Sequence, residues 1–166
     1  MITGGEEIIM VNTYSYDSDF GRIIITEENK CITEIIMGNS EYNSSINSPY
    51  ESDLIKNAYN QLQEYFSGKR KSFDLPLAPK GTDFQKKVWK ALQEIPYGST
   101  CSYKDIAVKI GNKNSCRAVG NANNKNPIFI VIPCHRVIGA NGSLVGYGGG
   151  LDLKKKLLDL EKNNMC

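Results

Sequence analysis

Several features are missing from this sequence, and each absence excludes a class of protein. No run of about 18 apolar residues is present, so no membrane-spanning helix is predicted. The first ten residues carry Glu6 and Glu7 but no basic residue, which does not fit a secretory signal peptide. We therefore expect a cytoplasmic protein that does not bind a membrane.

Metal ligands and paired cysteines are also scarce. The chain has one histidine and five cysteines, and no two cysteines have the C-x-x-C spacing. An odd number of cysteines without a secretion signal favours reduced thiols over a disulfide framework. Neither a metal site nor a bound cofactor is predicted.

The charge of the chain is distributed unevenly along its 166 residues, a length that suits one domain or two small ones. Residues 1–79 hold six basic and twelve acidic side chains, whereas residues 80–166 hold fourteen basic and six acidic ones. A basic half indicates contact with a polyanion such as nucleic acid. A solvated surface with chance asymmetry is the alternative, and charge alone leaves both open.

The N-terminal part of the chain has the pattern of strands followed by one helix. Two β-branched runs, at 22–26 and 31–37, flank a polar turn and predict a hairpin, and the apolar run at 8–11 predicts a further strand. Ser48-Pro49-Tyr50-Glu51 has the form of a capping box and predicts a helix start. That helix is expected to end at Ser67-Gly68.

Composition and charge both change near residues 78–81. An alternating segment at 73–77 predicts a short or edge strand just before this point. We therefore predict two domains, a strand-and-helix domain over 1–78 and a second domain over 79–166.

The second domain begins with three predicted helices. A capping box starts a helix at Thr82, a second helix is expected to start at Ser102-Tyr103-Lys104-Asp105, and Asn114 or Ser115 caps a third helix that runs to about residue 124. A four-residue turn at 111–114 joins the last two of these helices. The pair is a candidate helix-turn-helix, although many unrelated helix pairs share this pattern.

One face of the third helix is unusual because Arg117, Gly120, Asn121 and Asn124 share it. Glycine inside a helix costs roughly 1 kcal/mol relative to alanine. Gly120 either lets a partner approach the backbone closely or packs tightly against another helix. The sequence leaves both interpretations open.

Cys134 stands beside the only histidine, His135, after an apolar run at 128–132 and Pro133. A thiol reacts as its thiolate, so it needs a base or a positive neighbour. Adjacent side chains of an extended chain point opposite ways, so a water bridge between the thiol and His135 is expected. A carboxylate such as Glu161 would orient the imidazole, but spacing alone does not select it from the other acids. The pair alone leaves a buried structural cysteine, a hydrolase, a redox sensor and an alkyl acceptor open.

Seven motifs follow one another along residues 82–161: Thr82-x-Phe84-Gln85-x-x-Val88-Trp89, Ile95-Pro96-x-Gly98, Ser102-Tyr103, Arg117-Ala118-Val119-Gly120, Asn126-Pro127, Ile132-Pro133-Cys134-His135-Arg136-Val137 and Gly146-Tyr147-x-Gly149-Gly150-Leu151. Together they resemble the methylated-DNA–protein-cysteine methyltransferases, the O6-alkylguanine-DNA alkyltransferases. The resemblance covers roughly half of the chain. Residues 1–75 match only as a small strand-and-helix domain.

The resemblance implies an α/β (α+β) two-domain fold. Its N-terminal domain would be ribonuclease-H-like, and its mainly helical C-terminal domain would carry a winged-helix-like helix-turn-helix. It also implies DNA repair by direct reversal, with the alkyl group of O6-alkylguanine, and of O4-alkylthymine, transferred irreversibly to Cys134. Each molecule, a monomer without cofactor, would act once. A non-catalytic lesion-binding module is the alternative, and a cysteine hydrolase is a third.

The resemblance assigns the catalytic roles to five residues. Cys134 would accept the alkyl group, and His135, oriented by Glu161, would take the thiol proton through water. Asn126 would brace the active-site turn, and Tyr103 would donate a hydrogen bond to the guanine.

The resemblance further implies binding of double-stranded DNA in the minor groove with the target base flipped out. Arg117 would replace the base in the stack, and Gly120 would let its helix press into the groove. The base pocket would be lined by Tyr147, Leu144, Val145 and Gly148, with Arg136 also among the substrate and DNA contacts. Gly148 stands where some relatives have serine.

Overall fold

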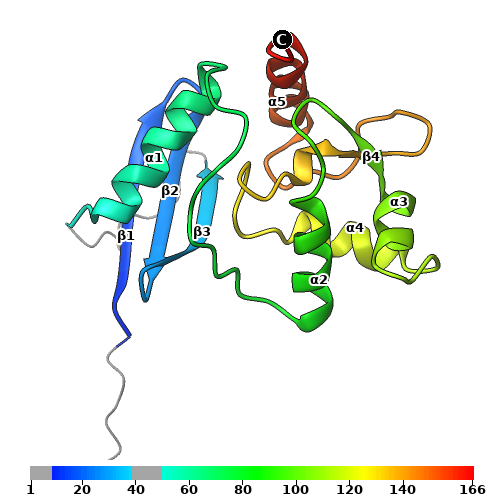
Figure 1. Cartoon of the computed structure of the whole chain (residues 1–166), viewed down its shortest axis with the longest axis horizontal. Coiled ribbons are helices and arrows are strands. Elements are labelled where there is room, and N and C mark those ends of the chain that lie inside the picture. The colour runs from blue at the N-terminus through cyan, green and yellow to red at the C-terminus, as the bar shows by residue number, and fades with distance from the viewer. Residues whose placement is uncertain (1–8, 39–49) are drawn as a thin grey trace, which may run out of the picture.

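The computed structural model describes residues 9–38 and 50–166, which form two packed halves (Figure 1). A three-stranded sheet with helix α1 across it makes the N-terminal half, and helices α2 to α5 surround the segment that carries Cys134. None of the helices in these residues is long and apolar enough to cross a membrane. In chain order the elements are β1 (Val11–Ser18), β2 (Gly21–Glu28), β3 (Cys31–Gly38), α1 (Asp53–Phe66), α2 (Asp83–Leu92), β4 (Cys101–Ser102), α3 (Tyr103–Lys109), α4 (Cys116–Asn124), η2 (Cys134–Arg136), β5 (Val137–Ile138) and α5 (Leu151–Asn163).

The sheet is an antiparallel meander in the order β1-β2-β3. The predicted hairpin is confirmed, and its turn residues Asn29 and Lys30 both have positive φ, as a two-residue type I′ turn requires. The strand expected from the run at 8–11 is displaced along the chain, because only Val11 of that run belongs to it. Residues 9 and 10 are exposed coil, residue 8 lies outside the described residues, and the first strand begins at Val11. The rest of this strand lies in the region expected to form strands, but its bounds were not predicted, because it is polar and pairs only with β2.

Helix α1 begins one turn later than the capping box at 48–51 predicts, although residues 48 and 49 themselves lie outside the described part of the chain. Its N-cap is Ser52, whose hydroxyl accepts the Ile55 N–H at 3.1 Å and donates to the buried carboxylate of Glu27 on β2. The bond to the sheet favours this serine over the earlier one. The helix ends at Ser67, as predicted.

The linker after α1 does not form the strand predicted at 73–77. Its one regular contact there is a bridge between Leu77 and Ile32 of β3, with Ile32 N–H donating to Pro76 O at 2.8 Å. Pro76 has no N–H to continue a ladder, which explains why the pairing stays isolated.

The free edge of β3 also meets the C-terminal half. Ile35 N–H donates to Pro127 O at 2.8 Å, and Phe129 N–H donates to Ile35 O at 3.0 Å. The chain segment that leads to Cys134 is therefore hydrogen-bonded to the N-terminal sheet.

The predicted capping box at Thr82 and the predicted helix starts at Ser102 and after Ser115 are confirmed, and Ser102 also forms a capping box with Asp105. Trp89 of α2 donates its indole N–H to Ala122 O at 2.8 Å, which ties α2 to α4. As Figure 1 shows, α2, α3 and α4 lie together on the side of the molecule away from α1. The two-part α/β architecture expected from the sequence is present.

Candidate active site

Two tight turns of the backbone directly precede Cys134. Val131 N–H bonds back to Phe129 O at 2.8 Å around Ile130, whose φ of 72° is a strained value for a β-branched residue. A second three-residue turn follows at Pro133, with φ −82° and ψ 62°. The thiol then opens the short 3-10 helix η2. These two turns fix the backbone on the N-terminal side of the sulfur.

Asn126 holds the turn together. Its Nδ2 donates to Cys134 Sγ at 3.1 Å and to Ile132 O at 2.8 Å, and its Oδ1 accepts the Ile128 N–H at 3.0 Å. All three bonds are buried, so the side chain is fully used in fixing the sulfur and the segment before it.

The Cys134 thiol is protonated at neutral pH. Burial raises its pKa to about 11, and the nearby Asn126, Lys154 and Tyr147 only partly oppose this shift. A thiol held in this way reacts only if a base removes its proton.

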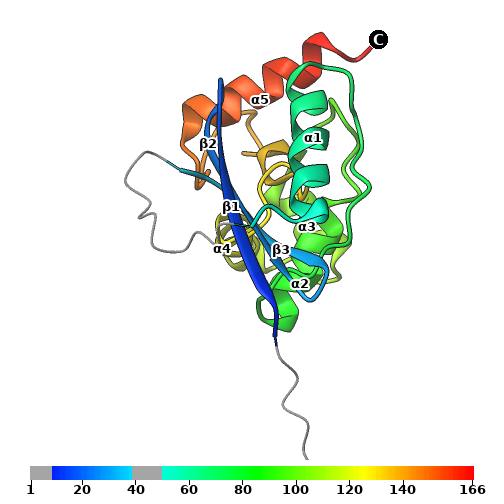
Figure 2. The ribbon, with the colours of Figure 1, turned by 90° about the vertical axis from the view of Figure 1, so that its left-hand side faces the viewer.

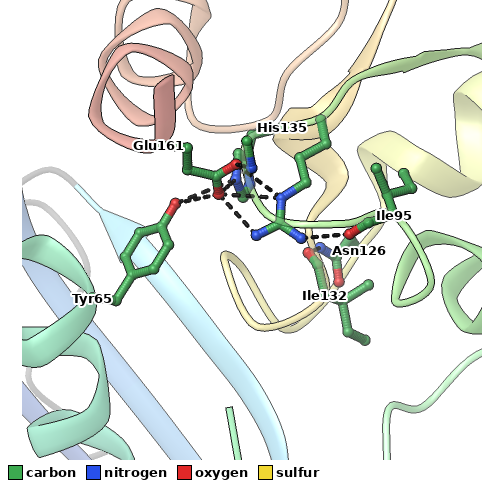
Figure 3. Close-up of polar contacts among 8 residues, drawn as sticks. Tyr65, Ile95, Asn126, Ile132, His135 and Glu161 are labelled. Atoms are coloured by element: carbon green, nitrogen blue, oxygen red, sulfur yellow. Dashed lines mark hydrogen bonds and ion pairs between the residues drawn. The ribbon is translucent and has the colours of Figure 1, made fainter. Parts of the chain in front are cut away.

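The buried carboxylate of Glu161 and the imidazole of His135 lie next to each other (Figure 3). Glu161 Oε1 is 2.7 Å from His135 Nε2. Burial alone would raise the pKa of Glu161, but hydrogen bonds from His135 and Arg136 lower it to about 2. The ionised carboxylate can only accept, so Nε2 carries the proton and Nδ1 is unprotonated.

His135 Nδ1 is buried and has no hydrogen-bond partner among the described residues. Burial lowers the pKa of His135, so the ring is neutral. Although the chain turns at this point, no hydrogen bond joins Cys134 Sγ to either ring nitrogen. The imidazole thus has a free basic nitrogen in a buried, polar corner.

Arg136 was expected to contact the substrate or the DNA, but its side chain points into the protein. Its buried guanidinium donates hydrogen bonds of 2.9 to 3.1 Å to the two carboxylate oxygens of Glu161 and one of 2.7 Å to Ile95 O. The guanidinium also lies over the Tyr97 ring. Arg136 therefore stabilises the ionised carboxylate of Glu161 from inside the protein.

A loop covers the thiol. Tyr103 Oη and Lys154 Nζ each donate to Val145 O at 2.9 Å, and Lys154 also donates to Val137 O at 2.5 Å. Cys134 is 1% exposed beneath this loop. Burial and the neighbouring Cys134 thiol raise the pKa of Tyr147 well above its ordinary value, so its buried hydroxyl, which lies near the sulfur, stays protonated.

A groove of about 450 Å³ lies outside the loop, between it and α4. The predicted face of α4 opens into it, with Arg117 exposed. A Cβ added to Gly120 would meet nothing nearer than Tyr103 at 3.9 Å, so packing does not require glycine there. The groove is lined by Tyr103, Cys116, Arg117, Gly120, Asn121, Asn124, Val145 and Gly146.

The remaining pocket residues lie in the same loop. Leu144 is half-buried, and Gly148 is exposed. A Cβ on Gly148 would lie 3.2 Å from the Phe129 ring, so a serine there would need a small shift of that ring.

Two residues of this site were missed from the sequence. Tyr65 belongs to the apolar stripe of α1, so its pattern predicts an ordinary core residue. Lys154 begins a run of three lysines, and such a run predicts a solvent-exposed surface. A signal for Lys154 existed, because it shares a helix face with Leu157 and Glu161 at i, i+3 and i+7. No local pattern distinguishes Tyr65.

Comparison with known proteins finds relatives of both halves of the chain. Residues 11–79 match the family model of the 6-O-methylguanine DNA methyltransferase ribonuclease-like domain, and residues 83–163 match that of the DNA-binding domain. A methylated-DNA–protein-cysteine methyltransferase of Methanosarcina mazei is 51% identical over 145 residues, which cover 86% of this chain and 92% of the relative. One from Mycobacterium leprae is 44% identical, covering 94% and 95%.

Solved structures also match this chain over most of its length. The O6-methylguanine methyltransferase of Mycobacterium tuberculosis superposes with a TM-score of 0.83 at 44% identity, covering 93% of this chain and 94% of the other. The Mycobacterium tuberculosis OGT in complex with DNA gives a TM-score of 0.82 over 93% of each chain. With both halves matched and the relatives covered almost end to end, the chain belongs to the methylated-DNA–protein-cysteine methyltransferase family.

Proposed function

We propose that this protein repairs DNA by transferring the alkyl group of O6-alkylguanine to Cys134. The observation that carries the proposal is a buried thiol held by Asn126 next to a neutral imidazole, His135, whose free Nδ1 has an ionised carboxylate behind it. Methylated-DNA–protein-cysteine methyltransferase activity is the activity of the relatives that the chain matches along its length.

The chemistry is a single displacement. The thiol proton passes through a water molecule to His135 Nδ1, and Glu161 stabilises the resulting imidazolium. The sulfur then attacks the alkyl carbon, the bond from this carbon to O6 breaks, and its electron pair stays on the guanine. Tyr103 donates a hydrogen bond to the departing base. The thioether has no route back to a thiol, so each molecule acts once. Its substrate is either O6-alkylguanine or O4-alkylthymine.

The DNA approaches through α4. The target atom is inaccessible in a stacked duplex, so the base flips out and Arg117 takes its place. Gly120 suits a narrow minor groove, because this residue has no side chain to hold the helix backbone away from the DNA. The base enters past Val145, where Tyr103 exchanges its bond to the loop carbonyl for one to the base, and Tyr147, Leu144 and Gly148 line the pocket.

Mass spectrometry tests the transfer directly. After incubation with a duplex containing O6-methylguanine, the peptide that contains Cys134 should gain one methyl group, and repaired DNA should stop accumulating at one equivalent of protein. Cys134→Ala should abolish the transfer and leave DNA affinity within about twofold, because the side chain is buried away from the groove.

Two outcomes would contradict this function. An unmodified Cys134 in a protein that binds the methylated duplex would favour a lesion-binding module. Turnover of small esters or amides, without salt-dependent DNA binding, would favour a hydrolase.

A further inference from the structure

The active-site carboxylate receives a hydrogen bond from the N-terminal half of the protein. Tyr65, in the last turn of α1, donates its hydroxyl to Glu161 Oε1 at 2.7 Å (Figure 3). Its oxygen also lies 3.3 Å from His135 Nε2. We propose that Tyr65 is a positioning residue for the alkyl transfer: its hydroxyl orients the Glu161 carboxylate toward His135 and limits its basicity. This inference rests on the proposed function.

The hydroxyl of Tyr65 is not explained by packing. The buried stripe of α1 lies against the sheet, and Tyr65 is fully buried at its end. A phenylalanine, as at the neighbouring Phe66, would fill this space without the desolvation cost of a phenol. The Glu161 contact is the one geometrically good hydrogen bond that compensates this cost.

The direction of the hydrogen bond is determined by the neighbouring groups. His135 Nε2 donates to Glu161, so it cannot accept from the phenol. Burial and the Glu161 charge raise the pKa of Tyr65 well above its ordinary value, so the phenol stays protonated and acts as a donor. The phenol and the imidazole therefore converge on the same oxygen, Oε1, and share its acceptor capacity.

The two halves of the protein bring these donors together. Figure 2 shows α1 and α5 near one another at the same end of the molecule, and Tyr65 and Glu161 come from these two helices. Arg136 and the Gly98 N–H hold the other side of the carboxylate from the C-terminal half. Without Tyr65, no donor from the N-terminal half would reach Glu161 among the described residues.

Removing the hydroxyl has a definite electrostatic consequence. A carboxylate that loses a donor becomes a stronger base and attracts the proton of His135 more strongly. The imidazole would then hold its proton to higher pH and be a less available base for the thiol. Among the residues that the structure describes, the charged and titratable groups around His135 are Glu161 and Lys154 on α5, Arg136 and the adjacent Cys134 on η2, and Tyr65 on α1, and Tyr97 lies against Arg136.

The test is Tyr65→Phe in the full chain, with Tyr59→Phe as the matched control. Tyr59 lies on the same helix, but its hydroxyl points to Asp17 O on β1, at 3.4 Å. The single-turnover rate on O6-methylguanine DNA should fall roughly tenfold in Tyr65→Phe, which corresponds to about 1.4 kcal/mol. The acidic limb of its pH–rate profile should move to higher pH, whereas Tyr59→Phe should match the wild type.

A second readout does not need alkyl transfer. His135 is the only histidine of the chain, so its ring protons give one unambiguous NMR titration. In Tyr65→Phe the midpoint should rise relative to the wild type. A shape-conserving fluorotyrosine at position 65 is a stronger donor and should move the midpoint the opposite way, and it covers the case in which Tyr65→Phe does not fold.

The outcomes separate this inference from the proposed function. A wild type that never alkylates Cys134 overturns the proposed function, while a shifted His135 titration would still establish the Tyr65 contact. A wild type that transfers the alkyl group, with rate, pH profile and titration unchanged in both position-65 variants, overturns the positioning role. A lower rate with an unchanged titration would reduce Tyr65 to packing and also overturn it.

Discussion

At the scale of single residues, the site depends on a charge kept inside the protein. Glu161 is buried and ionised because His135 and Arg136 donate to it. This arrangement was only half visible in the sequence, where Glu161 was one candidate among many acids. The adjacency of Cys134 and His135 was readable, but the residues that tune them come from distant segments, which a linear pattern does not bring together.

The lowered pKa of Glu161 predicts how stability depends on pH. The folded value of about 2 is below the ordinary 4.5, so the stabilisation is present above about pH 4.5 and is lost as the pH falls toward 2. Between pH 6 and pH 3 the wild type should lose about 2 kcal/mol more unfolding free energy than Glu161→Gln. Urea unfolding at both pH values measures this difference, and equal losses in the two proteins would contradict it.

At the scale of secondary structure elements, the helices were more predictable than the strands. The capping boxes at Thr82 and Ser102 are local signals, and α2 and α3 start where these signals lie. Strand β1 is polar and pairs with one strand, β2, and the start of α1 depends on a bond from Ser52 to Glu27. Both depend on contacts made only in the folded chain, which explains why pattern reasoning missed them.

Gly120 in α4 gives a prediction about this helix. Gly120→Ala should stabilise the fold by up to about 1 kcal/mol, because the added Cβ has room and alanine favours helix. The same Cβ should weaken DNA binding if α4 presses into a groove. Thermal unfolding and fluorescence anisotropy measure the two effects. Asn60→Ala, on the exposed face of α1, is the control that should stabilise without changing DNA affinity. Unchanged affinity in Gly120→Ala would argue against close approach of DNA.

Arg117 at the start of α4 gives a second prediction. Arg117→Ala should slow repair of a duplex by tenfold or more, because an unstacked base costs a few kcal/mol that the inserted side chain offsets. Reaction with the free base O6-methylguanine should stay unchanged, since Arg117 is exposed and does not touch Cys134. Comparing the two rates separates base extrusion from chemistry. An equal loss on both substrates would show instead that the variant damages the thiol site.

At the scale of the whole molecule, charge separates the two halves of the chain. The acidic residues dominate the first half and the basic residues the second, where the helix pair lies. This division and the two-part architecture were readable from composition. The hydrogen bonds that join the halves, from β3 to the segment before Cys134 and from α1 to α5, were not, because they link positions far apart in the chain.

The charge division predicts a salt-dependent, largely sequence-independent DNA affinity. The logarithm of the affinity should fall linearly with the logarithm of salt concentration. Lys113→Gln, in the turn between α3 and α4, should reduce the slope by about 1 unit if the lysine meets a phosphate. Lys56→Gln on α1 is the control and should leave the slope unchanged. Equal slopes for all three proteins would place the DNA elsewhere.

The bond between Tyr65 and Glu161 spans 96 positions of the chain. Contacts of such high sequence separation form slowly, because a long loop must close before they stabilise the chain. During synthesis, Cys134 leaves the ribosome before α5 does, and it remains an ordinary, unassisted thiol until α5 folds back onto α1. The hydrogen-bond network around His135 and Glu161 is thus completed late in folding, only when both halves are in place.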